Sequence, residues 1–278
     1  MSALPPHLIR LRRLLSAGLA LALPLAATAG CTREIVVPVA PTGFSVIIDG
    51  DKVSGAFPDA LRELGHKFGC RFTFPVRPRA RLSYMFLESG EADLLLPSSR
   101  STKRDQQAEY VPMMRLKMAL VSLKRSPVRL GSVPALLDAR QLRGVAVRSY
   151  VFGDEYSRLM ALLEGQHRMD YAATNLAVAR MLKAGRADFT IAAPSLFLAS
   201  LEEDAALDGV AEEVQFTLLD GLPPAESGVY VSRRSLSPQD QATLMQLLQH
   251  GARSATFWKW FRHYYPPQMA AYALRVGH

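Results

Sequence analysis

The sequence has few cysteines and none of the short motifs that identify common enzymes. Only Cys31 and Cys70 occur among the 278 residues, and one such pair matches no zinc-binding or thiol-redox spacing. No G-x-S-x-G, H-E-x-x-H, P-loop or G-x-G-x-x-G pattern is present. We therefore predict that the protein is not an enzyme and needs no cofactor and no metal. An enzyme that lacks a short motif stays an alternative.

Long apolar stretches and blocks of one charge are also scarce. Beyond the N-terminal 30 residues, no stretch is long and apolar enough to span a membrane. The formal charge of +8 comes from 33 Lys and Arg against 25 Asp and Glu. These residues are interleaved, without the basic block that follows a phosphate backbone. We predict no nucleic-acid partner and a mild preference for anionic ligands.

Residues 1–30 have the pattern of a signal peptide. Three early arginines precede the apolar run of residues 14–26, which is too short to span a bilayer. Residues 27–29 (A-T-A) fit a cleavage site, which would leave Cys31 free to pair with Cys70 in an oxidising compartment. The residues up to Cys31 also resemble a lipobox, which would lipidate Cys31 and leave the second cysteine alone. Either route exports the protein to the periplasm, the second with a lipid anchor.

The most informative stretch is residues 87–114. A helix end at Gly90 leads to a short apolar strand, residues 93–96, and then to a loop of serines, a threonine and arginines. Open α/β sheets bind ligands at the edge where strands end in such loops. We predict that hydroxyl groups and a guanidinium of this loop belong to a binding site.

The Leu-x-x-Gly-x-Ala-Asp pattern of that stretch occurs a second time, 95 residues later. Gly90 and Asp93 correspond to Gly185 and Asp188, and an apolar strand and a proline follow each copy. Two α/β lobes built to one plan would place two sheet edges face to face. The repeat therefore favours a protein with a cleft between two lobes.

The pattern resembles the extracellular solute-binding protein family 3, the periplasmic amino-acid-type binding proteins of ABC transporters. The resemblance is carried by Leu87, Gly90, Asp93, Ser99, Thr102, Arg104 and Tyr110. It implies an α/β fold of the two-lobed, type II periplasmic binding protein class, in which each lobe is a mostly parallel sheet flanked by helices. It also implies a small-molecule ligand and an ABC transporter permease in the inner membrane as partners. We expect the protein to be a monomer.

In such a fold two hinge crossings join the lobes. The strand-like residues 117–124 and 228–232 are the predicted crossings. Lobe 1 would comprise residues 32–120 and 228–278, and lobe 2 would comprise residues 121–227. The C-terminal part of the chain therefore returns to lobe 1.

The resemblance also implies a set of ligand-binding residues. They are Phe44, Ser98, Ser99, Arg104, Ser149 and Tyr150. Phe44 would stack on the ligand, or else cap the core of lobe 1. Arg104 would pair with a ligand carboxylate, because a guanidinium matches a carboxylate in two hydrogen bonds, and Arg100 is the competing anchor. The turn at Ser149 and Tyr150 precedes a helix and would offer backbone N–H groups to an anion.

Other charged residues near the predicted cleft are expected to be structural. Arg79 and Arg81 belong to a predicted helix over residues 78–88. We expect both on its solvent side, and the alternative is that Arg81 faces the cleft. Asp59 and Asp93 lie at a helix boundary and a strand boundary. Neither is therefore expected to turn into the cleft.

One departure from the resembled family bears on the ligand. Amino-acid binders of this family carry an acidic residue shortly after the strand that begins at Asp188, and that residue pairs with the ligand's ammonium group. Here the position is Ala193. A buried ammonium without a partner is unfavourable. We therefore predict a small polar, carboxylate-bearing ligand, either amino-acid-like or an organic acid, and favour an anion over a zwitterion. The alternatives are a periplasmic enzyme of the cyclohexadienyl dehydratase type and a ligand-sensing lipoprotein.

Overall fold

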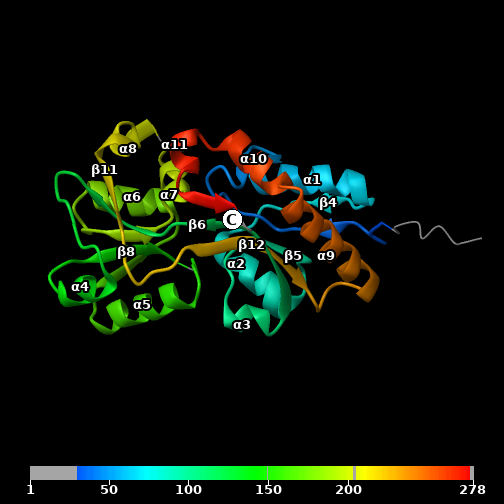
Figure 1. The fold of residues 1–278 in the computed structure, drawn as a ribbon, viewed down its shortest axis with the longest axis horizontal. Coiled ribbons are helices and arrows are strands. Elements are labelled where there is room, and N and C mark those ends of the chain that lie inside the picture. The colour runs from blue at the N-terminus through cyan, green and yellow to red at the C-terminus, as the bar shows by residue number, and fades with distance from the viewer. Residues whose placement is uncertain (1–29, 149, 203–204, 276–278) are drawn as a thin grey trace, which may run out of the picture.

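The computed structural model describes residues 30–148, 150–202 and 205–275, which form two α/β lobes (Figure 1). The blue to blue-green start of the chain and most of its orange-to-red end make lobe 1, and the green and yellow middle of the chain makes lobe 2. Lobe 1 starts with β1 (Ile35–Val36), β2 (Ile47–Asp49), β3 (Lys52–Ser54), α1 (Ala56–Phe68), β4 (Phe72–Thr73), α2 (Arg79–Tyr84), the π-helical η1 (Met85–Ser89), β5 (Leu94–Ser98), α3 (Thr102–Asp105) and β6 (Ala108–Leu116).

The middle of the chain then forms lobe 2, and the C-terminal part returns to lobe 1. Lobe 2 contains β7 (Ala119–Leu123), α4 (Val133–Asp138), β8 (Gly144–Val147), α5 (Asp154–Gly165), β9 (Met169–Ala172), α6 (Asn175–Lys183), β10 (Thr190–Ala192), α7 (Pro194–Leu201), the 3₁₀ turn η2 (Ala205–Leu207), α8 (Val210–Glu213) and β11 (Val214–Leu218). The return comprises β12 (Ala225–Ser232), α9 (Pro238–Arg253), α10 (Thr256–Tyr264), α11 (Pro267–Ala270) and β13 (Ala273–Arg275).

The sheets combine antiparallel and parallel strand pairs. Lobe 1 has the sheet β13–β6–β12–β5 and lobe 2 the sheet β10–β7–β11, and all their neighbouring strands are antiparallel. Parallel pairs occur between β1 and β4 and between β8 and β9. The predicted two-lobed α/β fold is confirmed, but the larger sheet of each lobe is antiparallel rather than mostly parallel. Hydrophobic alternation along a strand shows which face is buried and not which way its neighbour runs, so the sequence did not reveal this.

The chain crosses between the lobes at two connections. Lys117 and Met118 separate β6 in the lobe 1 sheet from β7 in the lobe 2 sheet, and residues 219–224 separate β11 from β12. β6 and β12 lie in the middle of the molecule (Figure 1) and pair along their length. These connections adjoin the predicted crossing strands, and hinge motion at them stays a prediction.

The internal repeat is visible as the same local structure in both lobes. Gly90 and Gly185 both follow a helical segment with positive φ angles of 73° and 68°, a conformation that glycine adopts without strain. Asp93 Oδ2 accepts the backbone N–H of Val36 at 2.8 Å, and Asp188 Oδ2 accepts that of Arg143 at 2.8 Å. Each carboxylate therefore ties its strand to the preceding part of its own lobe.

Helices from both ends of the chain close the core of lobe 1. α10 lies beside α1 (Figure 1), and the ring centres of Phe57 of α1 and Phe257 of α10 are 5.4 Å apart. Both rings are buried, and burying such a side chain contributes roughly 1.5–3 kcal/mol.

Among the described residues, none of the helices combines the length and the apolar character needed to cross a bilayer.

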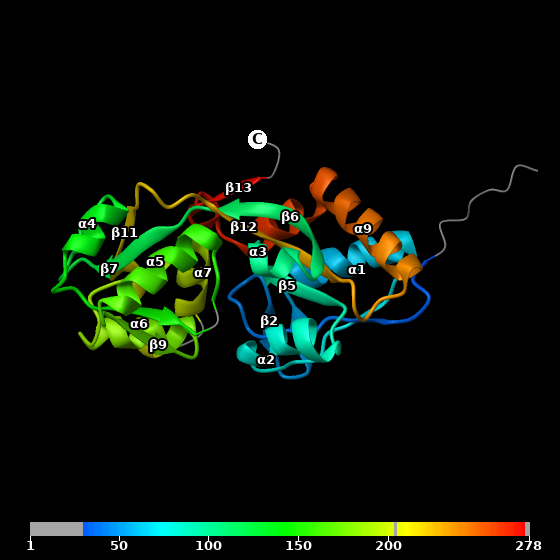
Figure 2. The same cartoon turned by 90° about the horizontal axis from the view of Figure 1, so that it is seen from below.

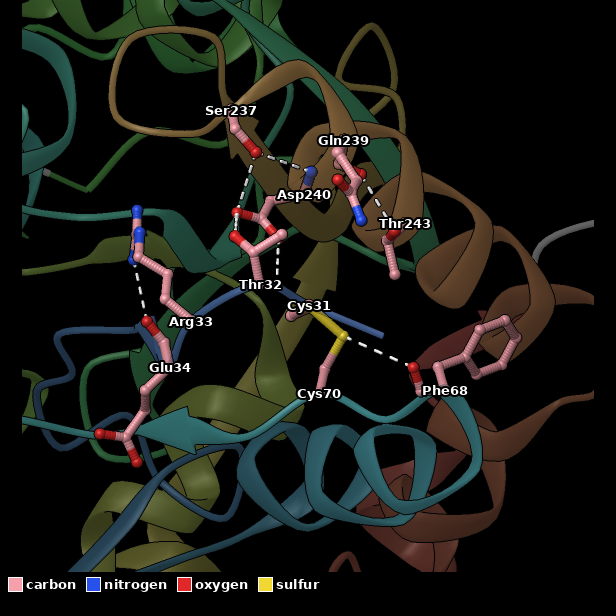
Figure 3. The surroundings of a disulfide bond; sticks show 10 residues. All are labelled: Cys31, Thr32, Arg33, Glu34, Phe68, Cys70, Ser237, Gln239, Asp240 and Thr243. Atoms are coloured by element: carbon pink, nitrogen blue, oxygen red, sulfur yellow. Dashed lines mark hydrogen bonds between the residues drawn. A yellow bond between two sulfur atoms is a disulfide. The ribbon is translucent and has the colours of Figure 1, made fainter. Parts of the chain in front are cut away.

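A disulfide bond joins the start of the described chain to the end of α1. Cys31 and Cys70 are bonded, with 4.8 Å between their Cα atoms and 39 residues of separation (Figure 3). Nearby, the backbone N–H and the hydroxyl of Thr32 donate to the Asp240 carboxylate of α9 at 2.7 and 2.6 Å. The Cys31 sulfur cannot also carry the thioether of a lipid anchor. The sequence left two alternatives for Cys31, pairing with Cys70 or lipidation, and in the structure Cys31 is paired.

Removing this disulfide should weaken the fold. We expect the double variant Cys31→Ala/Cys70→Ala to lose about 2–4 kcal/mol of unfolding free energy, because the bond restricts a long loop of the unfolded chain. Urea unfolding of the oxidised protein and of the double variant measures the difference. Reduced wild-type protein is the control and should unfold with the double variant. Equal stability of the oxidised protein and the double variant would contradict the expectation.

Candidate functional site

A small cavity lies where the two lobes meet. Its volume is about 30 Å³, which is room for one or two water molecules. It is lined by Thr42, Arg79, Pro97, Ser98, Ser99, Arg104, Leu116, Tyr150, Val151, Phe152, Leu196 and Ser227. Lobe 1 supplies the polar residues from the ends of its strands and from α2 and α3, which lie at its edge toward lobe 2 (Figure 1, Figure 2). The cavity is smaller than an amino acid, so the lobes must separate to admit one.

Arg104 is held under the loop that follows β5. Its Nη1 donates to Ser98 Oγ and to the Ser99 carbonyl oxygen, both at 2.9 Å. Both serines are buried, and α3 starts at Thr102, which turns Arg104 back toward them. Burial and the nearby charge of Arg79 lower the pKa of Arg104 below its usual value. The fold therefore holds this guanidinium where its charge is poorly compensated.

Arg79 brings a second guanidinium to the same cavity. It is the first residue of α2, and its side chain donates to Thr42 Oγ1 at 3.3 Å and to the Pro97 carbonyl at 3.4 Å. The guanidinium carbon lies 5.1 Å from the centre of the Tyr150 ring of lobe 2, within cation–π range. The expectation that Arg79 faces solvent is wrong. A residue at the start of a helix can extend its side chain past the helix end, which helical periodicity does not show.

No acidic side chain of the described residues balances these two charges. Among the described residues that line the cavity, none is Asp or Glu, and neither guanidinium has an ion-pair partner among the described residues. Asp93 pairs with Arg33, and Asp59 pairs with Arg62. The position where the resembled family has an acid is Ala193, fully buried as the N-cap of α7. The cavity is therefore positively charged.

The structure brings only some of the predicted site residues to the cavity. Ser98, Ser99, Arg104 and Tyr150 line the cavity, as does the unpredicted Phe152. The Phe152 ring packs edge-on against Tyr150 with their centres 5.6 Å apart. The sequence did contain a signal for Phe152. It directly precedes Gly153, the N-cap of α5, and so belongs to the same turn as the predicted Tyr150.

Two other predicted residues do not contribute to the cavity as described. Phe44 does not line it, and its ring lies edge-on to Tyr265 with the centres 5.3 Å apart, so it caps the core of lobe 1. Ser149 lies outside the described residues. Arg100, the competing anchor, does not line this cavity and pairs with Asp105 at 2.8 Å.

A polar contact joins the lobes beside the cavity. The hydroxyl of Thr102 in lobe 1 donates to Asp154 Oδ2 of lobe 2 at 2.6 Å. This contact borders a wider hollow of about 370 Å³, which Phe152 also lines. The acidic side chains that line this hollow are Asp105, Asp154, Glu155 and Glu226. Arg100 also lines this hollow, so acidic side chains outnumber basic ones there, whereas the small cavity is lined by two arginines.

This architecture is that of the periplasmic binding proteins, and several solved structures share it. A substrate-binding protein of an amino acid ABC transporter matches with 13% identity over 84% of this chain and 99% of its own, at a TM-score of 0.63. A putative L-cystine ABC transporter protein from Listeria monocytogenes matches with 18% identity, coverages of 84% and 98%, and a TM-score of 0.64.

A sensor protein also shares the fold. A histidine kinase sensor domain with similarity to periplasmic binding proteins matches with 20% identity, covering 83% of this chain and 96% of its own, at a TM-score of 0.64. No protein-family model matches the sequence, and no curated protein matches it. At these identities the similarity establishes the fold and leaves the ligand to be argued from the site.

Proposed function

We propose that the protein is an exported solute-binding protein of the family 3 type, which captures a small carboxylate-bearing anion in the periplasm for an ABC importer. The observation that carries the proposal is Arg104. It is a partly buried guanidinium between two lobes, held by neutral oxygens of Ser98 and Ser99, and no carboxylate of the described residues lines the cavity beside it. A ligand carboxylate would supply the missing counter-charge through a two-bonded pair. A monomer that delivers its ligand to an inner-membrane permease fits this role.

The lining of the cavity supports binding rather than catalysis. A lyase on this fold would need a group that transfers a proton near neutral pH. Arginine stays protonated there, which leaves the Tyr150 hydroxyl as the one other ionisable group among the described lining residues. The amino-acid ABC transporter proteins that share the fold are substrate-binding proteins by name. We therefore assign no catalytic role.

A ligand-sensing role is the second candidate, because a histidine kinase sensor domain shares the fold over most of both chains. Both roles need the same ligand cleft, so the site supports them equally. They differ in the partner, which is a permease for import and a kinase for sensing. Co-purification from envelope membranes with crosslinking separates the two partners.

The ligand class is tested by titrating matched pairs at constant salt. Pentanoate is compared with norvaline, and glutarate with glutamate, by isothermal titration calorimetry. We expect each des-amino compound to bind at least about tenfold more tightly, because the ammonium group would lose its water and find no acid at Ala193. Tighter binding of the amino acids would refute the anion assignment, and no binding of any carboxylate would refute the proposed function.

A further inference from the structure

We propose that the ligand carries two negative charges, one paired with Arg104 and one with Arg79. The proposal rests on the proposed function and assigns the ligand class of the same cleft. Both guanidiniums line one cavity and donate to neighbouring residues at the end of β5, Arg79 to the Pro97 carbonyl and Arg104 to the Ser98 hydroxyl. Two cationic groups therefore flank the same short segment of chain.

Arg79 and Arg104 differ from the surrounding arginines, which form ion pairs. Arg33 pairs with Asp93 and Arg62 with Asp59, each at 2.6 Å. Arg100 pairs with Asp105 at 2.8 Å. By contrast, the two cavity arginines contact only neutral oxygens and the Tyr150 ring among the interactions of the described residues. The three surrounding arginines therefore have carboxylate partners, whereas no carboxylate of the described residues lines the cavity.

Electrostatics then favours a dianion over a monoanion. The two guanidinium groups line one cavity and carry charge of the same sign, so they repel each other. Burial, and after it the charge of Arg79, lower the pKa of Arg104. A monoanion would neutralise one guanidinium and leave the second desolvated and unpaired, which is costly when the cleft closes. A dianion leaves neither unpaired.

The remaining walls limit the size of the ligand. Leu116, Phe152 and Leu196 give the cavity apolar sides, which suit a short methylene chain between two acidic groups. Tyr150 comes from lobe 2 and covers Arg79 of lobe 1. Separation of the lobes would uncover this guanidinium, and a ligand would then occupy the space beside it. Short dicarboxylates have the required charge and length.

The test compares molecules of the same shape with two charges or one. Malonate, succinate and glutarate, each with its half-amide, are titrated by calorimetry at pH 7.5 and constant ionic strength. We expect the best dicarboxylate to bind at least tenfold more tightly than its half-amide. Arg79→Gln should abolish this preference while half-amide binding persists, whereas Arg104→Gln should weaken both.

Arg81→Gln is the matched control, because Arg81 is on the same helix with a side chain 53% exposed; it should leave both affinities unchanged. Should Arg79→Gln fail to fold by circular dichroism, Arg79→Lys keeps the charge and should retain part of the preference. Equal binding of dicarboxylate and half-amide, or an unchanged preference in Arg79→Gln, overturns the dianion assignment and leaves the proposed function standing. Failure of every carboxylate to bind overturns both.

Discussion

Replacing Asp93 with asparagine is expected to lower the free energy of unfolding by about 3 kcal/mol. Asp93 is 2% exposed and pairs with both terminal nitrogens of Arg33 at 2.6 and 2.7 Å. It also accepts hydrogen bonds from the Val36 amide and the Ser235 hydroxyl. The asparagine would turn an NH₂ group toward donors and break the ion pair. Arg33 is 42% exposed, so part of its charge returns to water and the expected loss is at the lower end for a buried pair.

The repeated sequence pattern supplies the control for this experiment. Asp188 occupies the equivalent place in lobe 2 and accepts the Arg143 amide, and no ion pair to it is found among the described residues. Asp188→Asn should therefore cost only about 1 kcal/mol, the net contribution of one hydrogen bond. Urea unfolding of both variants measures the difference. Equal losses in the two variants would mean that the Arg33 pair contributes nothing measurable to stability.

The loop after β5 could be predicted because its signals are local. Glycine ends the helix before it at Gly90, and Asp93 ties the start of the strand to its neighbour. The Ser/Thr/Arg composition that follows predicts a polar sheet edge. The same signals recur in lobe 2, which indicated two lobes. These inferences hold because backbone conformation at a glycine or a strand start depends on the nearest residues.

The rest of the cavity could not be predicted because it depends on contacts between distant segments. Arg79 reaches the cavity because Pro97 and Tyr150 lie beside it, 18 and 71 positions later in the sequence. From the sequence, Phe44 could stack on the ligand or cap the core of lobe 1. In the structure its ring packs against Tyr265, which is near the other end of the chain. The pairing of Cys31 stayed open because the sequence near it also fits a lipidation signal. A residue's helical or strand pattern does not reveal which lobe will cover it.

Replacing Arg104 with alanine is expected to weaken carboxylate binding more than 100-fold while the protein keeps its fold. The guanidinium is the predicted carboxylate anchor, and removing one partner of a buried charge pair costs about 2–5 kcal/mol or more. In the ligand-free protein the same charge is unfavourable, since burial and Arg79 both lower its pKa. The unliganded variant should therefore be at least as stable as the wild type, a trade of stability for function. Calorimetric titration with glutarate and thermal unfolding without ligand measure the two effects.

Arg100→Ala is the matched control, four residues earlier in the same loop. Arg100 is exposed and pairs with Asp105, and exposed pairs of this kind contribute about 0–1 kcal/mol. Its loss should leave glutarate affinity within about twofold of the wild type. If Arg100→Ala abolished binding and Arg104→Ala did not, the anchor would be the wrong arginine. If Arg104→Ala lost binding only because it unfolded, the unliganded melting curve would show it, because that curve is expected to stay the same or to move upward.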